Sequence, residues 1–82
     1  MSRKSAKYIA MELVGYAASD VYEIWKDMGL IIKNKYGDWT LTELGVQFGG
    51  KMSKNSLQSV PTFEANYIID KMIEWYTVHR KQ

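Results

Sequence analysis

The sequence has no cysteine, one proline and one histidine among its 82 residues. Without cysteine the chain can form neither a disulfide framework nor a thiolate metal site, so packing or a partner chain must stabilise its core. The lone His79 has no second histidine with which to complete a zinc site. We therefore expect no metal and no other cofactor. The absence of cysteine also agrees with the cytoplasmic location that we predict.

Long apolar runs and a strong charge excess are missing as well. No uninterrupted apolar segment approaches the roughly 18–20 residues that cross a membrane, and none follows the basic N-terminal residues. We expect a soluble protein without a membrane partner. Eleven Lys/Arg against nine Asp/Glu leave a net charge of +2, which neither requires nor excludes a nucleic-acid partner. The length fits a single domain over residues 1–82, and the initial Met with no linker favours a complete chain.

Two runs of apolar side chains in residues 1–29 have the spacing of a helix face. They are Ala6, Ile9, Ala10 and Leu13, and then Val21, Ile24, Trp25 and Met28. Ser5 and Ser19 stand where N-caps are expected, and Gly15 and Gly29 stand where the helices should end. Because only residues 15–18 connect the two helices, the pattern predicts a helix-turn-helix.

The middle of the chain predicts a β-hairpin over residues 30–42. Its isoleucine-rich first arm ends in a polar cluster, and Trp39 and Leu41 then alternate with threonines. Thr42 is expected to cap a short helix over residues 43–50. Residues 51–61 contain three Ser, one Asn, two Lys and the only Pro without an apolar period, so we predict a loop there.

Residues 62–80 predict a last helix, with Thr62 as its N-cap. Its apolar residues cover more than the single stripe that a helix facing solvent needs. This surplus predicts burial between other elements or a homodimer interface. The dimer residues would be Ile69, Met72, Ile73 and Tyr76.

The order helix, turn, helix, hairpin, followed by the residues WTLTELG at 39–45, resembles that of winged helix-turn-helix regulators. The longer segment DMGLIIKNKYGDWTLTELG is most similar to the small C-terminal domains of phage antirepressors of the KilA type. The resemblance covers residues 6–50. It implies an α+β winged helix-turn-helix of about four helices and one β-hairpin, with residues 19–28 as the recognition helix and residues 33–38 as the wing tip.

By this resemblance the first functional prediction is a DNA-binding transcriptional regulator of the kind that phages and mobile elements encode. In such proteins the cations of the wing and its flanks hold phosphates. The residues that would do so here come from the N-terminus, the wing and the predicted loop: Arg3, Lys4, Lys7, Lys33, Lys35, Tyr36, Lys51 and Lys54. Arg80 and Lys81 would add a further basic cluster near the C-terminus.

The outward face of the predicted recognition helix suggests a different partner. It carries three acids and one base, and an acidic face is repelled by DNA phosphates. Its residues are Asp20, Tyr22, Glu23, Lys26 and Asp27. The alternative prediction is a protein-binding antirepressor or inhibitor that uses this face against a basic surface of a host or phage regulatory protein. DNA binding requires the wing and loop lysines Lys33, Lys35, Lys51 and Lys54 to converge on one face with these acids turned away, whereas acids and bases interleaved there would favour the protein partner.

Enzymatic motifs are incomplete in this sequence. Residues 45–51 match the pattern G-x-x-x-x-G-K of a phosphate-binding loop, but Met52 stands where a Mg²⁺-binding Ser or Thr must follow. No nucleophile elbow positions the serines of residues 51–61. We therefore expect a binding module and not an enzyme.

Overall fold

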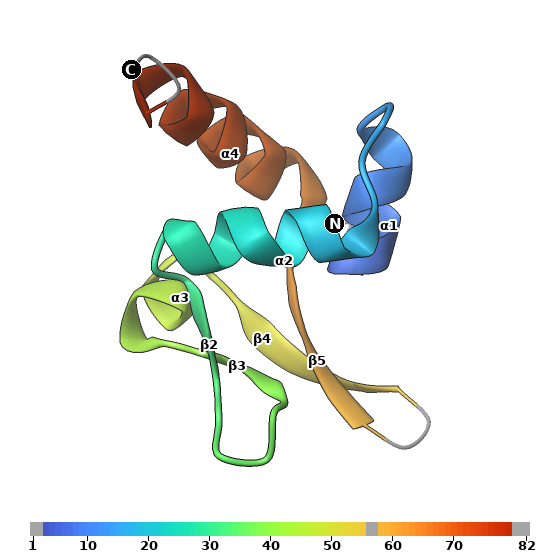
Figure 1. Cartoon of the computed structure of the whole chain (residues 1–82), viewed down its shortest axis with the longest axis vertical. Coiled ribbons are helices and arrows are strands. Elements are labelled where there is room, and N and C mark those ends of the chain that lie inside the picture. The colour runs from blue at the N-terminus through green and yellow to red at the C-terminus, as the bar shows by residue number, and fades with distance from the viewer. Residues whose placement is uncertain (1–2, 56–57, 80–82) are drawn as a thin grey trace.

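The computed structural model describes residues 3–55 and 58–79, so the basic cluster predicted at Arg80 and Lys81 lies outside the described residues. Its elements are β1 (Arg3–Ser5), α1 (Ala6–Glu12), α2 (Ala18–Asp27), β2 (Ile31–Lys33), β3 (Trp39–Leu41), α3 (Glu43–Gln47), β4 (Lys51–Asn55), β5 (Gln58–Glu64) and α4 (Ala65–His79). Helix α2 lies in the middle of the molecule. Helices α1 and α4 lie on one side of it, and α3 and both hairpins lie on the other (Figure 1).

Helices α1 and α2 confirm the predicted helix pair and pack against each other. The predicted cap of α2 is wrong by two residues, because Ala17 and not Ser19 occupies the N-cap position. Asp20 explains the earlier start, since its carboxylate accepts a hydrogen bond of 2.8 Å from the backbone N–H of Ala17. Gly29 ends the helix as predicted, with a φ of +82° that side chains other than glycine rarely adopt.

Trp25 is the centre of the core, with none of its surface exposed. Its ring packs edge-on against Phe63 of β5 at a centroid distance of 4.8 Å, and its indole N–H donates to the Met72 sulfur of α4 at 3.3 Å. Val21 is buried beside it on α2. One face of α2 thus joins the helices to the strands, as its apolar spacing predicts.

The first hairpin, β2–β3, confirms the prediction for residues 30–42, with Ile31 opposite Leu41 and Lys33 opposite Trp39. The Asn34 side chain holds its turn by accepting from the backbone N–H groups of residues 36 and 38. Thr42 caps α3 as predicted, since its hydroxyl oxygen accepts from the N–H of Gly45 at 3.0 Å. The helix itself is shorter than predicted and covers residues 43–47.

The described residues of the predicted loop, 51–55 and 58–61, are strands. They belong to a second antiparallel hairpin, β4–β5, and β1 pairs with β5 to give a three-stranded sheet in the order β1-β5-β4. The prediction failed because serine, lysine and asparagine hide the strand pattern, in which Pro61 and Phe63 are buried on one side. Pro61 is tolerated because the β1 ladder reaches only as far as Thr62, so Pro61 is paired on one side alone.

The last helix also begins later than predicted. Thr62 does not cap it, because residues 62–64 complete strand β5. Glu64 caps the helix instead, since its carboxylate accepts a hydrogen bond of 3.0 Å from the backbone N–H of Tyr67. The described residues therefore form a small α+β domain with four helices and two small antiparallel sheets, and the single predicted hairpin becomes two.

Candidate nucleic-acid interface

A groove of about 350 Å³ crosses the three-stranded sheet and is called the sheet groove below. Strand β1, helix α1 and both strands of the second hairpin contribute to it. Its lining residues are Arg3, Lys4, Ser5, Tyr8, Ser53, Lys54, Val60 and Thr62. The sheet order β1-β5-β4 thus brings two predicted N-terminal cations and one predicted loop cation into one site, although they lie about fifty residues apart in the chain.

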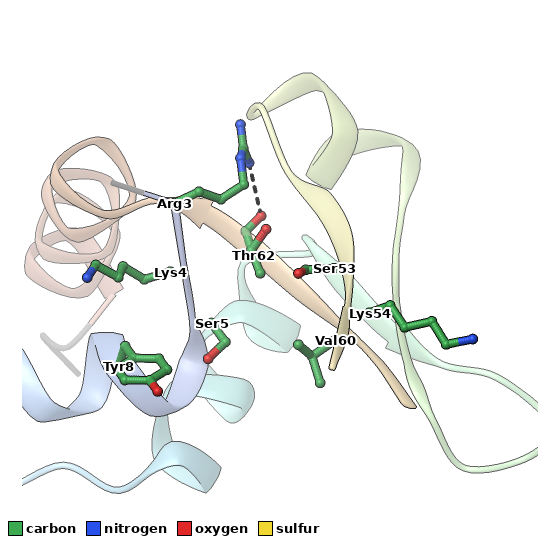
Figure 2. Close-up of a pocket in the computed structure, with 8 residues that line it drawn as sticks. All are labelled: Arg3, Lys4, Ser5, Tyr8, Ser53, Lys54, Val60 and Thr62. Atoms are coloured by element: carbon green, nitrogen blue, oxygen red, sulfur yellow. Dashed lines mark hydrogen bonds between the residues drawn. The ribbon is translucent and has the colours of Figure 1, made fainter. Parts of the chain in front are cut away.

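Lys4 and Lys54 line the groove at its two sides, but their ammonium groups point out of it, because their side chains alternate along β1 and β4 with those of Ser5 and Ser53. In Figure 2, Lys4 and Lys54 extend in opposite directions from the two sides of the groove, and the hydroxyls of Ser5, Ser53 and Thr62 lie between them. Of the described residues that line this groove, none is acidic. Glu64 is opposite Arg3 in the strand register of β1 and β5. Its carboxylate caps α4. The described lining is therefore basic without acidic residues, and Ser5 and Ser53 are its hydroxyls for a ligand, because the Thr62 hydroxyl already donates to the Lys51 carbonyl oxygen at 2.8 Å.

Arg3 has a structural role as well. Its guanidinium donates to the carbonyl oxygen of Gly49 at 2.8 Å and to that of Thr62 at 3.4 Å (Figure 2). These bonds tie the N-terminal strand to the end of α3 and to β5. Because these bonds already hold the Arg3 side chain in one conformation, it loses less conformational entropy when an anion binds to it.

The ring of Tyr8 holds a second cation of the groove lining, the ammonium of Lys4. The Lys4 ammonium lies 5.8 Å from the centroid of the Tyr8 ring, within the range of a cation–π contact. Sequence reasoning found Lys4 but missed Tyr8 and the groove hydroxyls. The alternation of side chains along a strand would have signalled Ser53, but only if residues 51–55 had been recognised as a strand.

A second groove, the hairpin groove, lies between the two hairpins. Its lining residues are Asn34, Asp38, Trp39, Thr40, Met52, Lys54 and Ser59. Lys54 lines both grooves, and the Lys33 ammonium lies 5.1 Å from the centroid of the Trp39 ring. Of the predicted cations, Lys54 therefore lines the hairpin groove, and Lys33 contacts its lining residue Trp39 without lining the groove itself. Asp38 gives this second groove mixed charge.

The other predicted cations are more dispersed. Lys35 and Tyr36 are exposed in the turn of the first hairpin, where the ammonium lies 5.4 Å from the ring centroid. Lys7 is exposed on α1, and Lys51 is exposed at the start of β4. Among the described residues that line the two grooves, neither Lys7 nor Lys51 is found. The four lysines of the predicted wing and loop thus do not gather in one groove.

The acidic face of α2 differs from its prediction in one residue. Tyr22 is not an outward contact residue, because its ring stacks on Trp39 at 5.5 Å and meets Trp25 edge-on at 6.2 Å. The aromatic cluster of the core draws it inward, and this burial raises the pKa of its hydroxyl above 10.0. Asp20, Glu23, Lys26 and Asp27 are exposed as predicted.

Two of the acids on this face already have partners. Asp20 accepts the N-cap hydrogen bond of α2, and the Glu23 carboxylate lies 3.8 Å from the Lys26 ammonium. Both interactions lie at the surface, where an ion pair contributes at most about 1 kcal/mol. Neither interaction changes the net charge of this face, because a backbone N–H carries no charge and Lys26 is itself one of the residues of the face.

Comparison with protein families, with curated proteins and with solved structures gives no match to this chain. In the described part of the chain, no helix has the length and apolar character needed to cross a membrane. Nor do three His, Cys, Asp or Glu side chains of the described residues gather where they could hold a metal ion.

Proposed function

We propose that this protein is a non-enzymatic regulator that binds duplex DNA by its phosphate backbone. The observation that carries the proposal is the sheet groove, whose described lining includes Arg3, Lys4, Lys54 and the hydroxyls of Ser5 and Ser53 and no acidic residue. Lysine, arginine, serine and threonine are the side chains that contact phosphate oxygens in protein–DNA complexes. The net charge of +2 leaves the molecule mildly attractive to a polyanion.

The spread of the cations favours an extended anion over a compact one. Lys4 and Lys54 point away from each other on opposite sides of the groove, so one small phosphate ion cannot meet both (Figure 2). A nucleic-acid backbone carries a phosphate at each nucleotide and would reach both sides. Lys33 and Lys35 on the first hairpin would extend this contact beyond the groove.

The elements are compatible with the winged helix-turn-helix that the sequence resembles. In that assignment α1 and α2 are the helix pair, and both hairpins, which extend from α2 on the side away from α4, act as wings (Figure 1). The hairpins then carry the contacts, because the exposed face of α2 presents Asp20, Glu23 and Asp27. Such a face is a poor reader of base edges, so we expect weak dependence on DNA sequence.

The alternative is protein binding through the acidic face of α2. Capping by Asp20, pairing of Glu23 with Lys26 and packing of Tyr22 against Trp39 leave fewer groups of this face for a partner. We therefore propose DNA first and keep the protein partner as the outcome that failure of DNA binding would favour.

The test is a titration of a labelled duplex of random sequence with the protein at two or more salt concentrations, followed by fluorescence anisotropy. Each lost phosphate contact lowers the slope of log affinity against log salt by about 0.9. The double variant Lys4→Ala/Lys54→Ala is expected to lower the slope by about 2 and to weaken binding to all sequences alike. Lys33→Ala/Lys35→Ala should act in the same direction if the first hairpin takes part.

A charge-matched control is Lys71→Ala/Lys26→Ala. Both lysines lie outside the two grooves in surface ion pairs, with Glu74 at 3.5 Å and with Glu23 at 3.8 Å. This variant has the same net charge as the groove variant. It should therefore lose only the small contribution to DNA affinity that comes from the overall net charge and not from phosphate contacts. Equal weakening by both pairs, or no binding by the unmodified protein at low salt, would overturn the proposal.

A further inference from the structure

Lysine ammonium groups lie over exposed tyrosine rings at two places on the candidate interface. At the sheet groove, the Lys4 ammonium lies 5.8 Å from the centroid of the Tyr8 ring, which is 50% exposed. In the turn of the first hairpin, the Lys35 ammonium lies 5.4 Å from the ring centroid of Tyr36, which is 76% exposed. Contact with phosphates uses the two lysines but makes no use of the two rings.

The fold itself makes little use of the Tyr36 ring. Among the described residues no other aromatic ring packs against it, whereas Trp39 of the same hairpin stacks on Tyr22 at 5.5 Å. The turn beneath it is fixed, since the Asn34 side-chain oxygen accepts from the backbone N–H groups of Tyr36 and Asp38 at 2.8 and 3.0 Å. A ring that a fixed turn holds in solvent loses little entropy when a flat ligand stacks on it.

Lys54 connects the two tyrosines. It lines the sheet groove together with Tyr8, and it lines the hairpin groove together with Asn34, whose side chain holds the turn of Tyr36. Figure 2 shows Tyr8 on one side of the sheet groove and Lys54 on the other. A polymer that crosses the sheet groove can therefore continue along the hairpin groove and meet both rings.

Cations that alternate with open aromatic faces match the chemistry of single-stranded nucleic acid. Its phosphates follow the positive charges while its bases stack on the rings. In an intact duplex the bases show only their edges in the grooves, so a tyrosine face finds no base face there. An acidic peptide would satisfy the lysines but would offer no regular series of flat rings to the tyrosines.

We propose that this interface binds single-stranded nucleic acid more tightly than an intact duplex, with bases stacked on Tyr8 and Tyr36 while the neighbouring lysines hold the phosphates. This inference rests on the proposed function, because it uses the same cations, and it adds unpaired bases as the feature that the protein recognises. Base–aromatic stacking accepts every base, so it agrees with the weak dependence on sequence expected above.

The test is fluorescence anisotropy with labelled oligo(dT) and oligo(U) of about 16 nucleotides and a duplex of the same length, at two salt concentrations. The unmodified protein should bind at least one single strand more tightly than the duplex, and the RNA arm shows whether the 2′-hydroxyl contributes. Tyr8→Leu/Tyr36→Leu keeps apolar bulk but removes both rings, so it should weaken single-strand binding by about tenfold or more. It should leave duplex binding and the salt slope nearly unchanged, because stacking releases no counterions.

The matched control is Tyr67→Leu. Tyr67 also lies beneath a lysine, with its ring centroid 5.5 Å from the Lys71 ammonium, and it is 43% exposed. It belongs to α4 and is outside the described lining of both grooves, so this variant should bind single strands as the unmodified protein does. Far-UV circular dichroism checks the fold of each variant, and Tyr36→Leu alone repeats the test at an exposed turn without altering a helix.

An affinity for single strands no higher than that for the duplex would overturn the inference. Equal weakening by the control and by the variant of both groove tyrosines would overturn it as well. Duplex binding in either case leaves the proposed function standing. Binding of single strands without any binding of the duplex would support this inference and overturn only the proposed preference for duplex DNA.

Discussion

Replacement of Trp25 by alanine is the most direct test of the core. The side chain is fully buried, meets Phe63 and Tyr22 edge-on and donates its indole N–H to the Met72 sulfur. Its removal takes apolar contacts from α2, α4 and β5 together, so the surrounding elements cannot all close on the space left. Deletion of a buried tryptophan typically costs about 3–5 kcal/mol, and the edge-on aromatic contacts place Trp25→Ala in the upper half of that range.

The expected result follows from the small size of the domain. At about 0.05–0.15 kcal/mol per residue, its whole free energy of unfolding is roughly 4–12 kcal/mol, so Trp25→Ala should lose between about a third of this free energy and all of it. Urea unfolding followed by far-UV circular dichroism measures the loss. Trp25→Phe is the matched comparison, because it keeps an aromatic ring at the same place and should cost clearly less. A Trp25→Ala protein within about 1 kcal/mol of the unmodified chain would refute the proposed packing.

Two further predictions concern stability. Gly45→Ala should destabilise the protein by about 1–3 kcal/mol despite the higher helix propensity of alanine, because its Cβ would meet the carbonyl oxygen of Leu30 and a methyl group of Leu41. Urea midpoints measure this, and a stabilised variant would contradict the close approach. Burial raises the pKa of Tyr22, so the folded state holds this proton more tightly than the unfolded state does. Stability from this group is complete below about pH 10 and declines as the pH rises further. Tyr22→Phe should flatten that decline in urea midpoints taken between about pH 8 and 11, whereas Tyr36→Phe, at an exposed position, should not. An equally steep decline after Tyr22→Phe would show that another group causes it.

The elements that sequence reasoning predicted well are those with local signals. Helix α2 combines apolar residues at helical spacing with Gly29 at its end, and the turn of the first hairpin is held by Asn34 within four residues. Thr42 caps α3 through a contact only three residues away. Each of these features depends on neighbours in the chain, which a sequence displays directly.

The second hairpin shows where local signals end. Residues 51–55 carry polar side chains and read as a loop, yet they pair with β5, which in turn pairs with Arg3–Ser5 at the other end of the chain. Strands β4 and β5 pair locally, but the β1–β5 pairing joins residues about sixty positions apart, and β5 is also held by the burial of Phe63 against Trp25. No pattern within residues 51–61 reveals the pairing with β1 or the packing on Trp25.

For the candidate site, the sequence alone determined which residues could bind phosphate, because charge is a property of the side chain. It also determined that α2 has an apolar face around Trp25 and an acidic face opposite. Only the tertiary structure decided that Lys4 and Lys54 share one groove, that Tyr22 turns inward to Trp39, and that Ile73 is left exposed on α4. The physical reason is that these outcomes depend on the order of the strands and on which apolar side chains find room in a small core. Contacts between distant segments of the chain decide both.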